Sequence, residues 1–310
     1  MLMMHSHDWA LVAFTIMTQM SVGSIWTLVL VHLFAGRKHG EEAADSLAEG
    51  SLLAVVIIVV LAFAASLFHL GSPLNAPRAV ANVGTSWLSR EILFGVIFAV
   101  LVVVYAFLQW RKIGPSILRS IIAWLAALVG IVLVLSEGMV YYSLASQPAW
   151  NSWTTILFFF VTAGLLGALA MGVTFVANYA VVKSKEPDCV LAKCDVLLDV
   201  MRWIAITSVI LLGIELVVLP IYLATLATGS AAALESVQLM IGPLGWALIL
   251  RIVLVFLGAG LFALFLYRNA LSSDREKVLA TLVYIAFGLV LVAEVLGRIM
   301  FYATHVNIGL

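Results

Sequence analysis

The chain alternates between long apolar runs and short polar segments. Eight runs are each long enough to cross the hydrocarbon core of a bilayer as an α-helix, which takes about 20 predominantly apolar residues. They cover approximately residues 9–35, 46–70, 87–110, 116–142, 153–182, 200–227, 243–267 and 277–304. This pattern predicts an all-α fold, a polytopic bundle of eight transmembrane helices that forms one integral membrane domain over residues 1–310.

The composition agrees with this prediction. Hydrophobic residues make up 64% of the chain, charged residues make up 10%, and the mean hydropathy is +1.17. Such values lie outside the range of ordinary soluble domains. The formal net charge is zero, so nothing indicates a nucleic-acid partner. The N-terminus has no basic leader with a cleavage signal, and the first run is therefore expected to be a retained span. We expect any water-soluble catalytic domain to belong to another polypeptide.

Basic residues are distributed unevenly among the connections between the runs. The odd-numbered connections all carry them, whereas the fourth, the sixth and both termini carry none, and the second has Arg78 with Arg90 at its edge. Cytoplasmic loops are enriched in Lys and Arg, which predicts a cytoplasmic (inner) membrane protein with both termini outside. The basic residues in and beside the odd connections are Arg37, Lys38, Arg111, Lys112, Arg119, Lys183, Lys185, Lys193, Arg202, Arg268, Arg275 and Lys277.

Ionisable residues within or at the ends of the spans gather in the outer half of the predicted bundle. Charge in a membrane is costly to keep, so such residues indicate a functional site. The helical rise places them by depth, and the one-sided set predicts a polar chamber that opens toward the outer face. The set comprises His69, Arg90, Glu91, Glu137, Arg251, Glu294, Arg298 and His305, with Glu215 near mid-depth and His32 on the inner side.

Two pairs in this set suggest specific roles. Glu294 and Arg298 are four residues apart and share a helix face, so they can form an ion pair that serves either helix packing or a proton path. His69 and Glu91 flank the second connection, and an imidazole beside a carboxylate can accept and relay the protons that quinol oxidation releases. The alternative is that His69 only caps a helix. His305 is either part of the site or a solvated interfacial residue.

Other candidate chemistry is weaker. Glu137, Glu215 and Arg251 fit either the site or helix packing. A haem with two imidazole ligands needs two facing histidines at one depth, and this would require His69 beside His305, so we expect no haem, metal or other bound cofactor. Cys189 and Cys194 are expected to be free thiols in a cytoplasmic loop. Glycines inside the spans are expected to permit close helix packing, namely Gly164, Gly167, Gly172, Gly258 and Gly260.

Several motifs carry a family resemblance. The segment 69–92 opens with His-Leu-Gly-Ser-Pro, contains an Asn-Val-Gly turn and closes with Leu-Ser-Arg-Glu-Ile. Further motifs are the paired tryptophans Trp150 and Trp153, the Arg-Ile-Val-Leu sequence that begins at Arg251, and the tail 294–305. Together they resemble the membrane anchor subunit of dimethyl sulfoxide reductase, the DmsC family, over most of the chain.

The resemblance implies a haem-free, eight-helix anchor that oxidises menaquinol. It also implies two partners on the outer face, a four-cluster iron–sulfur subunit that receives the electrons and a molybdopterin catalytic subunit. The family's quinol-binding His and Glu map onto His69 and Glu91, which we expect to be the catalytic pair. The charged fifth connection with its two cysteines does not look like a family feature. We expect a quinol pocket between the outer ends of the second, third and eighth spans, lined by His69, Arg90, Glu91, Glu294, Arg298 and His305.

Two other function classes stay open from the residues alone. A proton-coupled secondary transporter would place charges and broken helices near the midplane, where Glu215 and Pro220 are the candidates. A purely structural anchor would use its charges only to lock helices together. The residues do not decide between menaquinol and ubiquinol, and the terminal electron acceptor would be set by the catalytic subunit.

Overall fold

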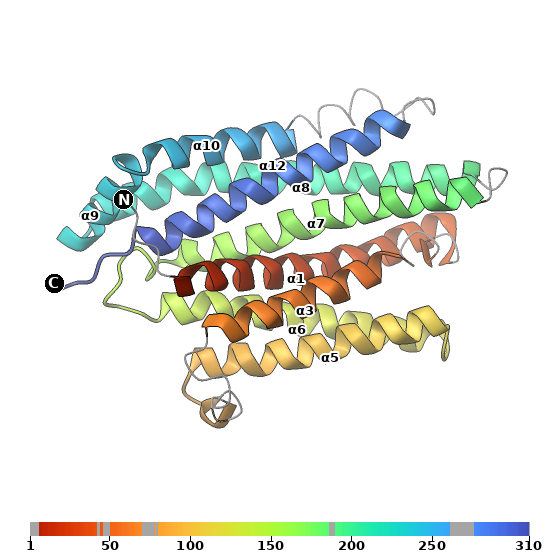
Figure 1. The fold of residues 1–310 in the computed structure, drawn as a ribbon, viewed down its shortest axis with the longest axis horizontal. Helices are drawn as coiled ribbons and strands as arrows, with labels where there is room; N and C mark the ends of the chain where they lie inside the picture. The colour runs from red at the N-terminus through yellow and green to blue at the C-terminus, as the bar shows by residue number, and fades with distance from the viewer. Residues whose placement is uncertain are drawn as a thin grey trace.

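The computed structural model describes residues 6–41, 44–45, 50–69, 78, 80–185, 190–260 and 276–309, and the regular structure in these ranges is helical (Figure 1). Two short helical turns, the 3-10 helix η2 (Val80–Asn82) and the π-helical η4 (Phe256–Gly260), accompany the longer helices. The longer helices are α1 (Ser6–His39), α3 (Ser51–His69), α5 (Trp87–Arg111), α6 (Ser116–Tyr142), α7 (Trp153–Lys185), α8 (Val190–Ala227), α9 (Ala231–Ile241), α10 (Gly245–Val255) and α12 (Glu276–Ala303).

The described helices confirm an all-helical membrane bundle. Seven of them are single helices long and apolar enough to span a bilayer, namely α1, α3, α5, α6, α7, α8 and α12. The helices α9 and α10 with η4 reach this length only together, and they are bent by 67° at the break between them. By length and composition, the described residues therefore provide seven candidate spans, or up to eight if the bent pair is one span. Which side of the membrane each end faces stays a prediction.

Two regions differ from the sequence-based expectation. Helix α8 begins at Val190, ten residues before the expected span, so Cys194 lies in a helix and not in a loop; Cys189 lies outside the described residues. The sixth connection contains α9, because Ser230 caps that helix by accepting a hydrogen bond from the Ala233 backbone at 3.3 Å. The apolar face of α9 is then buried against α8 and α10. Residues 261–267 of the seventh expected span lie outside the described residues.

Helices α1 and α7 form the centre of the bundle. In their most apolar stretches 72% and 67% of the residues are buried, against 39% or less in the other single spans. A Cβ added at Gly23 of α1 would lie 1.8 Å from the Ala163 carbonyl oxygen, and one at Gly167 of α7 would lie 2.1 Å from the Gly23 carbonyl carbon. Only glycine at both positions permits this backbone contact.

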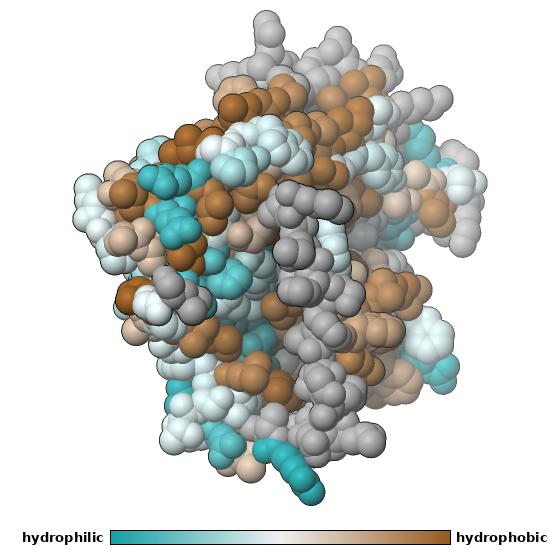
Figure 2. Space-filling model, turned by 60° about the vertical axis from the view of Figure 1, so that its left-hand side comes forward, coloured by the Kyte–Doolittle hydropathy of each residue, from teal (hydrophilic) through white to brown (hydrophobic). Residues whose placement is uncertain are grey.

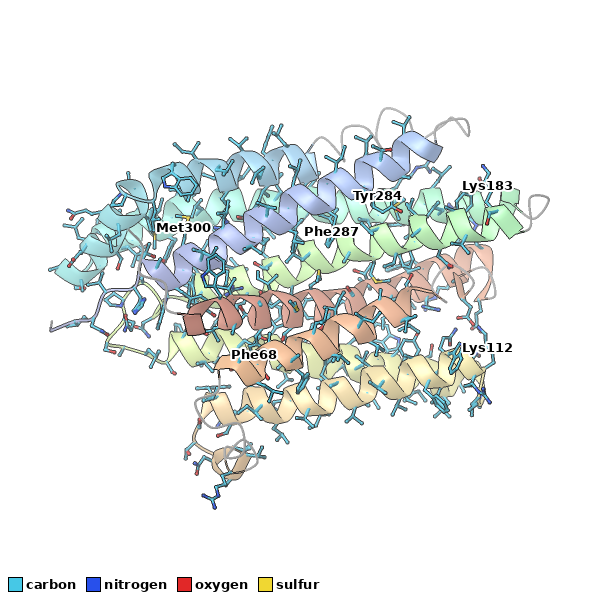
Figure 3. The ribbon with its side chains drawn as sticks, in the orientation of Figure 1. Phe68, Lys112, Lys183, Tyr284, Phe287 and Met300 are labelled. Atoms are coloured by element: carbon cyan, nitrogen blue, oxygen red, sulfur yellow. The ribbon has the colours of Figure 1, made fainter. Side chains whose placement is uncertain are left out.

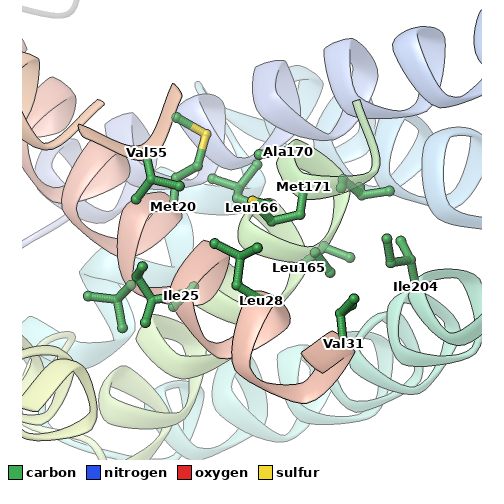
Figure 4. Packing of buried hydrophobic residues seen from close by; sticks show 14 of the residues in the cluster. Met20, Ile25, Leu28, Val31, Val55, Leu165, Leu166, Ala170, Met171 and Ile204 are labelled. Carbon is green, nitrogen blue, oxygen red and sulfur yellow. The ribbon is translucent and has the colours of Figure 1, made fainter. Parts of the chain in front are cut away.

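The packing roles expected of the other glycines are confirmed in part. A Cβ at Gly164 would come within 2.9 Å of Leu211, and one at Gly258 within 2.8 Å of Val290. A Cβ at Gly172 would make ordinary contacts, the nearest at 3.4 Å, and one at Gly260 would meet no described atom within 4 Å, so close packing at Gly260 stays a prediction. Around the central pair, buried aliphatic side chains of α1, α3, α7 and α8 interlock (Figure 4), among them Leu28, Val55, Leu166 and Ile204.

The bundle has two chemically different ends. At one end α3 finishes and α5 begins, close to the start of α1 and the end of α12 (Figure 1); we call it the Glu91 end. At the other end lie the basic residues Lys112 and Lys183, both labelled in Figure 3; we call it the Lys112 end. The grouping of basic residues at one end agrees with the distribution along the sequence.

Replacing Gly167 with alanine is expected to destabilise the bundle, because the new Cβ meets the rigid backbone of α1 and not a flexible side chain that could move aside. Overpacking of this kind costs about 1–3 kcal/mol. Thermal denaturation of the detergent-solubilised protein should show a lower Tm for Gly167→Ala. The control is Gly213→Ala in α8, where a Cβ meets no described atom within 4 Å. Equal effects of the two substitutions would contradict the assigned α1–α7 contact.

Candidate functional site

Glu91 is a buried carboxylate in the first turns of α5. Ser86 caps this helix by accepting a hydrogen bond from the Ser89 backbone at 3.3 Å, which fixes where the helix starts and so the depth of Glu91. Glu91 is 8% exposed, and no other described residue donates a hydrogen bond to its carboxylate. It lies within electrostatic range of Glu137, Tyr141 and Tyr302. A second carboxylate and two phenols therefore lie in its electrostatic neighbourhood.

Glu137 is connected to α12 through an amide side chain. The Nε2 atom of Gln19 in α1 donates a hydrogen bond to Glu137 Oε2 at 2.9 Å. The Oε1 atom of the same Gln19 accepts a hydrogen bond from Arg298 Nη2 at 2.6 Å. All three residues are buried. The Arg298 guanidinium also lies 3.8 Å from the centre of the Phe159 ring, an arrangement that attracts a cation to the ring face. Glu137, Gln19 and Arg298 thus form a continuous polar link across α6, α1 and α12.

A second polar group surrounds Arg251 of α10. Its Nη2 lies 2.8 Å from Glu215 Oε1 and 3.7 Å from Glu294 Oε1, and Glu294 Oε2 accepts a hydrogen bond from Thr162 at 2.6 Å. Gly297 makes this possible, since a Cβ there would lie 2.4 Å from Arg251 Nε. The Arg251 side chain passes across α12 at that glycine. One guanidinium is therefore placed between two buried carboxylates.

A cavity of about 70 Å³ lies between the two polar groups. Arg298 faces it from one group, and Arg251 and Glu294 face it from the other. This volume is well below the roughly 300–1,000 Å³ that is usual for sites of small molecules. The remaining walls of the cavity come from α7, α8, α9, α10 and α12.

Aromatic side chains close the network toward the Glu91 end. The Tyr141 and Tyr302 hydroxyls are 2.9 Å apart, and Trp150 donates a hydrogen bond from its indole nitrogen to the Phe301 carbonyl at 2.8 Å. His305 stacks on Trp150 with 4.5 Å between ring centres. Figure 2 is turned toward this end and shows hydrophilic side chains gathered among hydrophobic ones. His305 therefore stacks outside the buried carboxylates, as expected of an interfacial residue.

The side chain of Arg90 was expected to face the carboxylates, but it points elsewhere. It donates hydrogen bonds to the Val83 carbonyl at 2.8 Å and the Gly84 carbonyl at 2.9 Å, and its guanidinium stacks over Trp87 at 4.1 Å. These contacts direct the Arg90 side chain back to the segment before α5. There it stabilises the turn that contains Val83 and Gly84. His69 is the last residue of α3, and its side chain lies outside the described part of the structure.

The expected Glu294–Arg298 ion pair is not formed. Residues four apart share a helix face, but their side chains separate here because Arg298 turns to Gln19 and Glu294 turns to Thr162 and Arg251. Helix α12 packs on α10 and α7, whereas α5 packs on α6 and α3. Among the described residues, Gln19 links Glu137 to Arg298, and the pocket expected between the second, third and eighth spans stays a prediction.

Sequence reasoning missed Gln19 and Thr162. Each is an uncharged polar residue in an otherwise apolar run, a signal that also fits an ordinary buried side chain hydrogen-bonded within its own helix. Their long-range partners, 118 and 132 residues away along the chain, carry the network. Glu137 belongs to the first of the two polar groups, and Glu215 and Arg251 belong to the second.

Replacing Arg251 with methionine is expected to lower the Tm strongly, since Glu215 and Glu294 then stay buried without their cation. Breaking a buried ion pair from one side costs about 3–5 kcal/mol. Adding Glu215→Gln should restore part of the loss, measured by thermal denaturation of both variants. Arg78→Met, which removes an exposed cation, is the matched control and should leave the Tm unchanged. A double variant no more stable than Arg251→Met would refute the pairing.

Comparisons with known proteins agree with the resemblance. The sequence model of the family described as DMSO reductase anchor subunit (DmsC) matches residues 3–304. A relative from Escherichia coli, named as a component of its anaerobic dimethyl sulfoxide reductase, is 28% identical over 309 residues, covering 98% of this chain and 97% of that protein. A relative of the same description from Haemophilus influenzae is 26% identical over 306 residues, with 98% and 97% covered.

A more distant similarity covers about half of each protein. A sulfite dehydrogenase subunit of Allochromatium vinosum is 29% identical over 181 residues, which are 52% of this chain and 55% of that protein. The family match extends over nearly the whole chain, and the apolar helices make it a multi-pass membrane protein. The chain belongs to the DMSO reductase anchor subunit (DmsC) family.

Proposed function

We propose that this chain is the menaquinol-oxidising anchor of a reductase complex in the cytoplasmic membrane. Its partners would be an iron–sulfur subunit with four clusters, which takes the electrons, and a molybdopterin catalytic subunit, which uses them on an acceptor of the dimethyl sulfoxide type. Family membership supports the complex, because the relatives matched over their full length are named as components of anaerobic dimethyl sulfoxide reductases. It also favours an anchor over the transporter alternative.

The observation that carries the proposal is the environment of Glu91. Oxidation of a quinol releases two protons and two electrons, so the site needs groups that take up protons where the ring binds. Glu91 is a buried carboxylate with no hydrogen-bond donor among the described residues, and Glu137 lies within electrostatic range of it. Glu91 or His69 accepts the first proton, and Glu137 receives the second through Glu91. The electrons pass to the iron–sulfur subunit.

The ring contacts Glu91 from the side of α3. The cavity beside Arg298 has a volume of about 70 Å³, well below the roughly 300 Å³ of the smallest usual ligand sites, so Arg298 and Glu294 act on the ring through other residues. Gln19 links Arg298 to Glu137, which makes Arg298 a positioning residue for the carboxylate pair. Exposed apolar side chains at the end of α3 and the start of α5, including Leu67 and Leu88, supply an apolar approach from the lipid.

The Glu91 end faces outward in this proposal. Described basic residues concentrate at the Lys112 end, and cytoplasmic loops are enriched in such residues. Both partner subunits then dock on the connections around η2 and on the segment between α6 and α7. Quinol protons are released on the side where the acceptor is reduced, and so the cycle moves little charge across the membrane.

Replacing Glu91 with glutamine is expected to lower quinol-dependent reductase activity by about 10²-fold or more, because an amide cannot accept the proton. The assay uses membranes that contain the complete complex and a reduced menaquinone analogue as donor. Activity with an artificial donor that bypasses the anchor, measured in the same membranes, reports assembly and should stay unchanged.

Glu235→Gln is the matched control, since Glu235 is an exposed carboxylate of α9 at the same end of the bundle. It should keep full quinol-dependent activity. The role given to Glu91 would be wrong if Glu91→Gln kept its quinol-dependent activity. It would also be wrong if the activity with quinol and the activity with the artificial donor fell together.

A further inference from the structure

The Lys112 end contains a larger cavity that quinol oxidation does not use. Its volume is about 500 Å³, within the usual range for sites of small molecules. It lies between the second half of α1, the end of α5 and the start of α6. Its polar wall includes His32, Asp45, Gln109 and Arg119, and its apolar wall includes Trp124. The cavity is therefore amphipathic and lies at the opposite end of the bundle from Glu91.

The polar wall carries an excess of positive charge. Asp45 Oδ1 lies 2.9 Å from His32 Nε2, and Asp45 Oδ2 lies 3.8 Å from Arg119 Nη2 and 3.9 Å from Lys112 Nζ. His32 Nδ1 faces the Leu28 carbonyl at 3.0 Å. Both ring nitrogens of His32 therefore lie within hydrogen-bond distance of oxygen atoms.

Asp45 is the carboxylate that both Lys112 and Arg119 approach. Burial alone would raise the pKa of Asp45, but the hydrogen bond and charge of His32 and the charge of Lys112 hold that pKa below its ordinary value. The described side chains around the cavity include three that are always cationic at neutral pH, Arg37, Lys112 and Arg119, and two carboxylates, Asp45 and Glu41. Among these groups the cations exceed the carboxylates by one.

Hydrogen-bond donors also point to an anion. Pro115 occupies the N-cap position of α6 and supplies no side-chain hydrogen bond to that helix, so the partial positive charge of its N-terminus lies at the cavity beside Ser116. Gln109 is 2% exposed and its amide lies close enough to Asp45 to help lower the pKa of that carboxyl. The contact does not meet the geometry of a hydrogen bond, and the amide nitrogen has no other partner among the described residues. A buried donor without a partner is costly, and an anion in the cavity would supply the acceptor.

We propose that this cavity binds the phosphate group of an anionic phospholipid. Arg119, the N-terminus of α6 and the Gln109 amide would hold the phosphate. The acyl chains would leave along Ile117 and Trp124, which line the same cavity and are 65% and 42% exposed on the outer surface of the bundle. This apolar exit favours a lipid over free phosphate, and the site is independent of quinol oxidation.

The test is a titration of the purified full-length protein in phosphatidylcholine–detergent micelles, followed by its Tm. Phosphatidylglycerol should raise the Tm saturably, whereas more phosphatidylcholine should not. In Arg119→Gln and Gln109→Leu the apparent affinity for phosphatidylglycerol should fall by about tenfold or more. The control Arg111→Gln removes an exposed cation at the same end, whose guanidinium rests 5.6 Å from the centre of the Trp110 ring, and should keep the wild-type affinity.

Each outcome decides the proposal. Selective weakening in Arg119→Gln or Gln109→Leu supports it, and Gln109→Leu tests it even if Arg119→Gln fails to fold. An equal, saturable Tm increase with inorganic phosphate would support the anion site but overturn a lipid as its occupant. The proposal is overturned if phosphatidylglycerol has no effect, or if Arg111→Gln loses affinity as much as the two cavity variants.

Discussion

The backbone contact between α1 and α7 determines where the polar side chains meet. Gly23 and Gly167 allow the two helices to touch without an intervening side chain. Gln19 lies one turn from Gly23, and Thr162 lies next to Ala163, whose carbonyl faces Gly23. Each of these two polar side chains then reaches α12, Gln19 at Arg298 and Thr162 at Glu294. A contact between glycines thus sets the position of charged residues on a third helix.

The two buried arginines have different kinds of partners. Arg251 lies between two carboxylates, whereas Arg298 is held by an amide oxygen and an aromatic face. Together with Glu91 and Glu137, the network holds four carboxyl groups and two guanidinium groups. Isolated buried carboxylates are costly, and an acidic excess therefore makes the network suited to take up protons. A purely structural anchor could replace such a network with apolar packing at no loss of stability.

Much of the fold follows from the sequence, because a membrane span must be long, apolar and helical. The start of α5 at Trp87, the bounds of α6 and the grouping of charges toward one end are all predictable from local residues. The partners of those charges are not. Side-chain direction depends on helices more than a hundred residues apart, which is why Arg298 binds Gln19 instead of Glu294. Helix α9 was missed because a cap at Ser230 and a few polar residues resemble an ordinary loop.

The proposed function rests on contact between a quinol ring and Glu91. The most direct measurement is photolabelling of the assembled complex in its membrane with a photoreactive menaquinone analogue, followed by mass spectrometry of the labelled peptides. The account predicts saturable labelling at the end of α3 and the start of α5, which unlabelled menaquinone suppresses. Labelling confined to α8 and α10 around Arg251, or to the cavity at the Lys112 end, would contradict it.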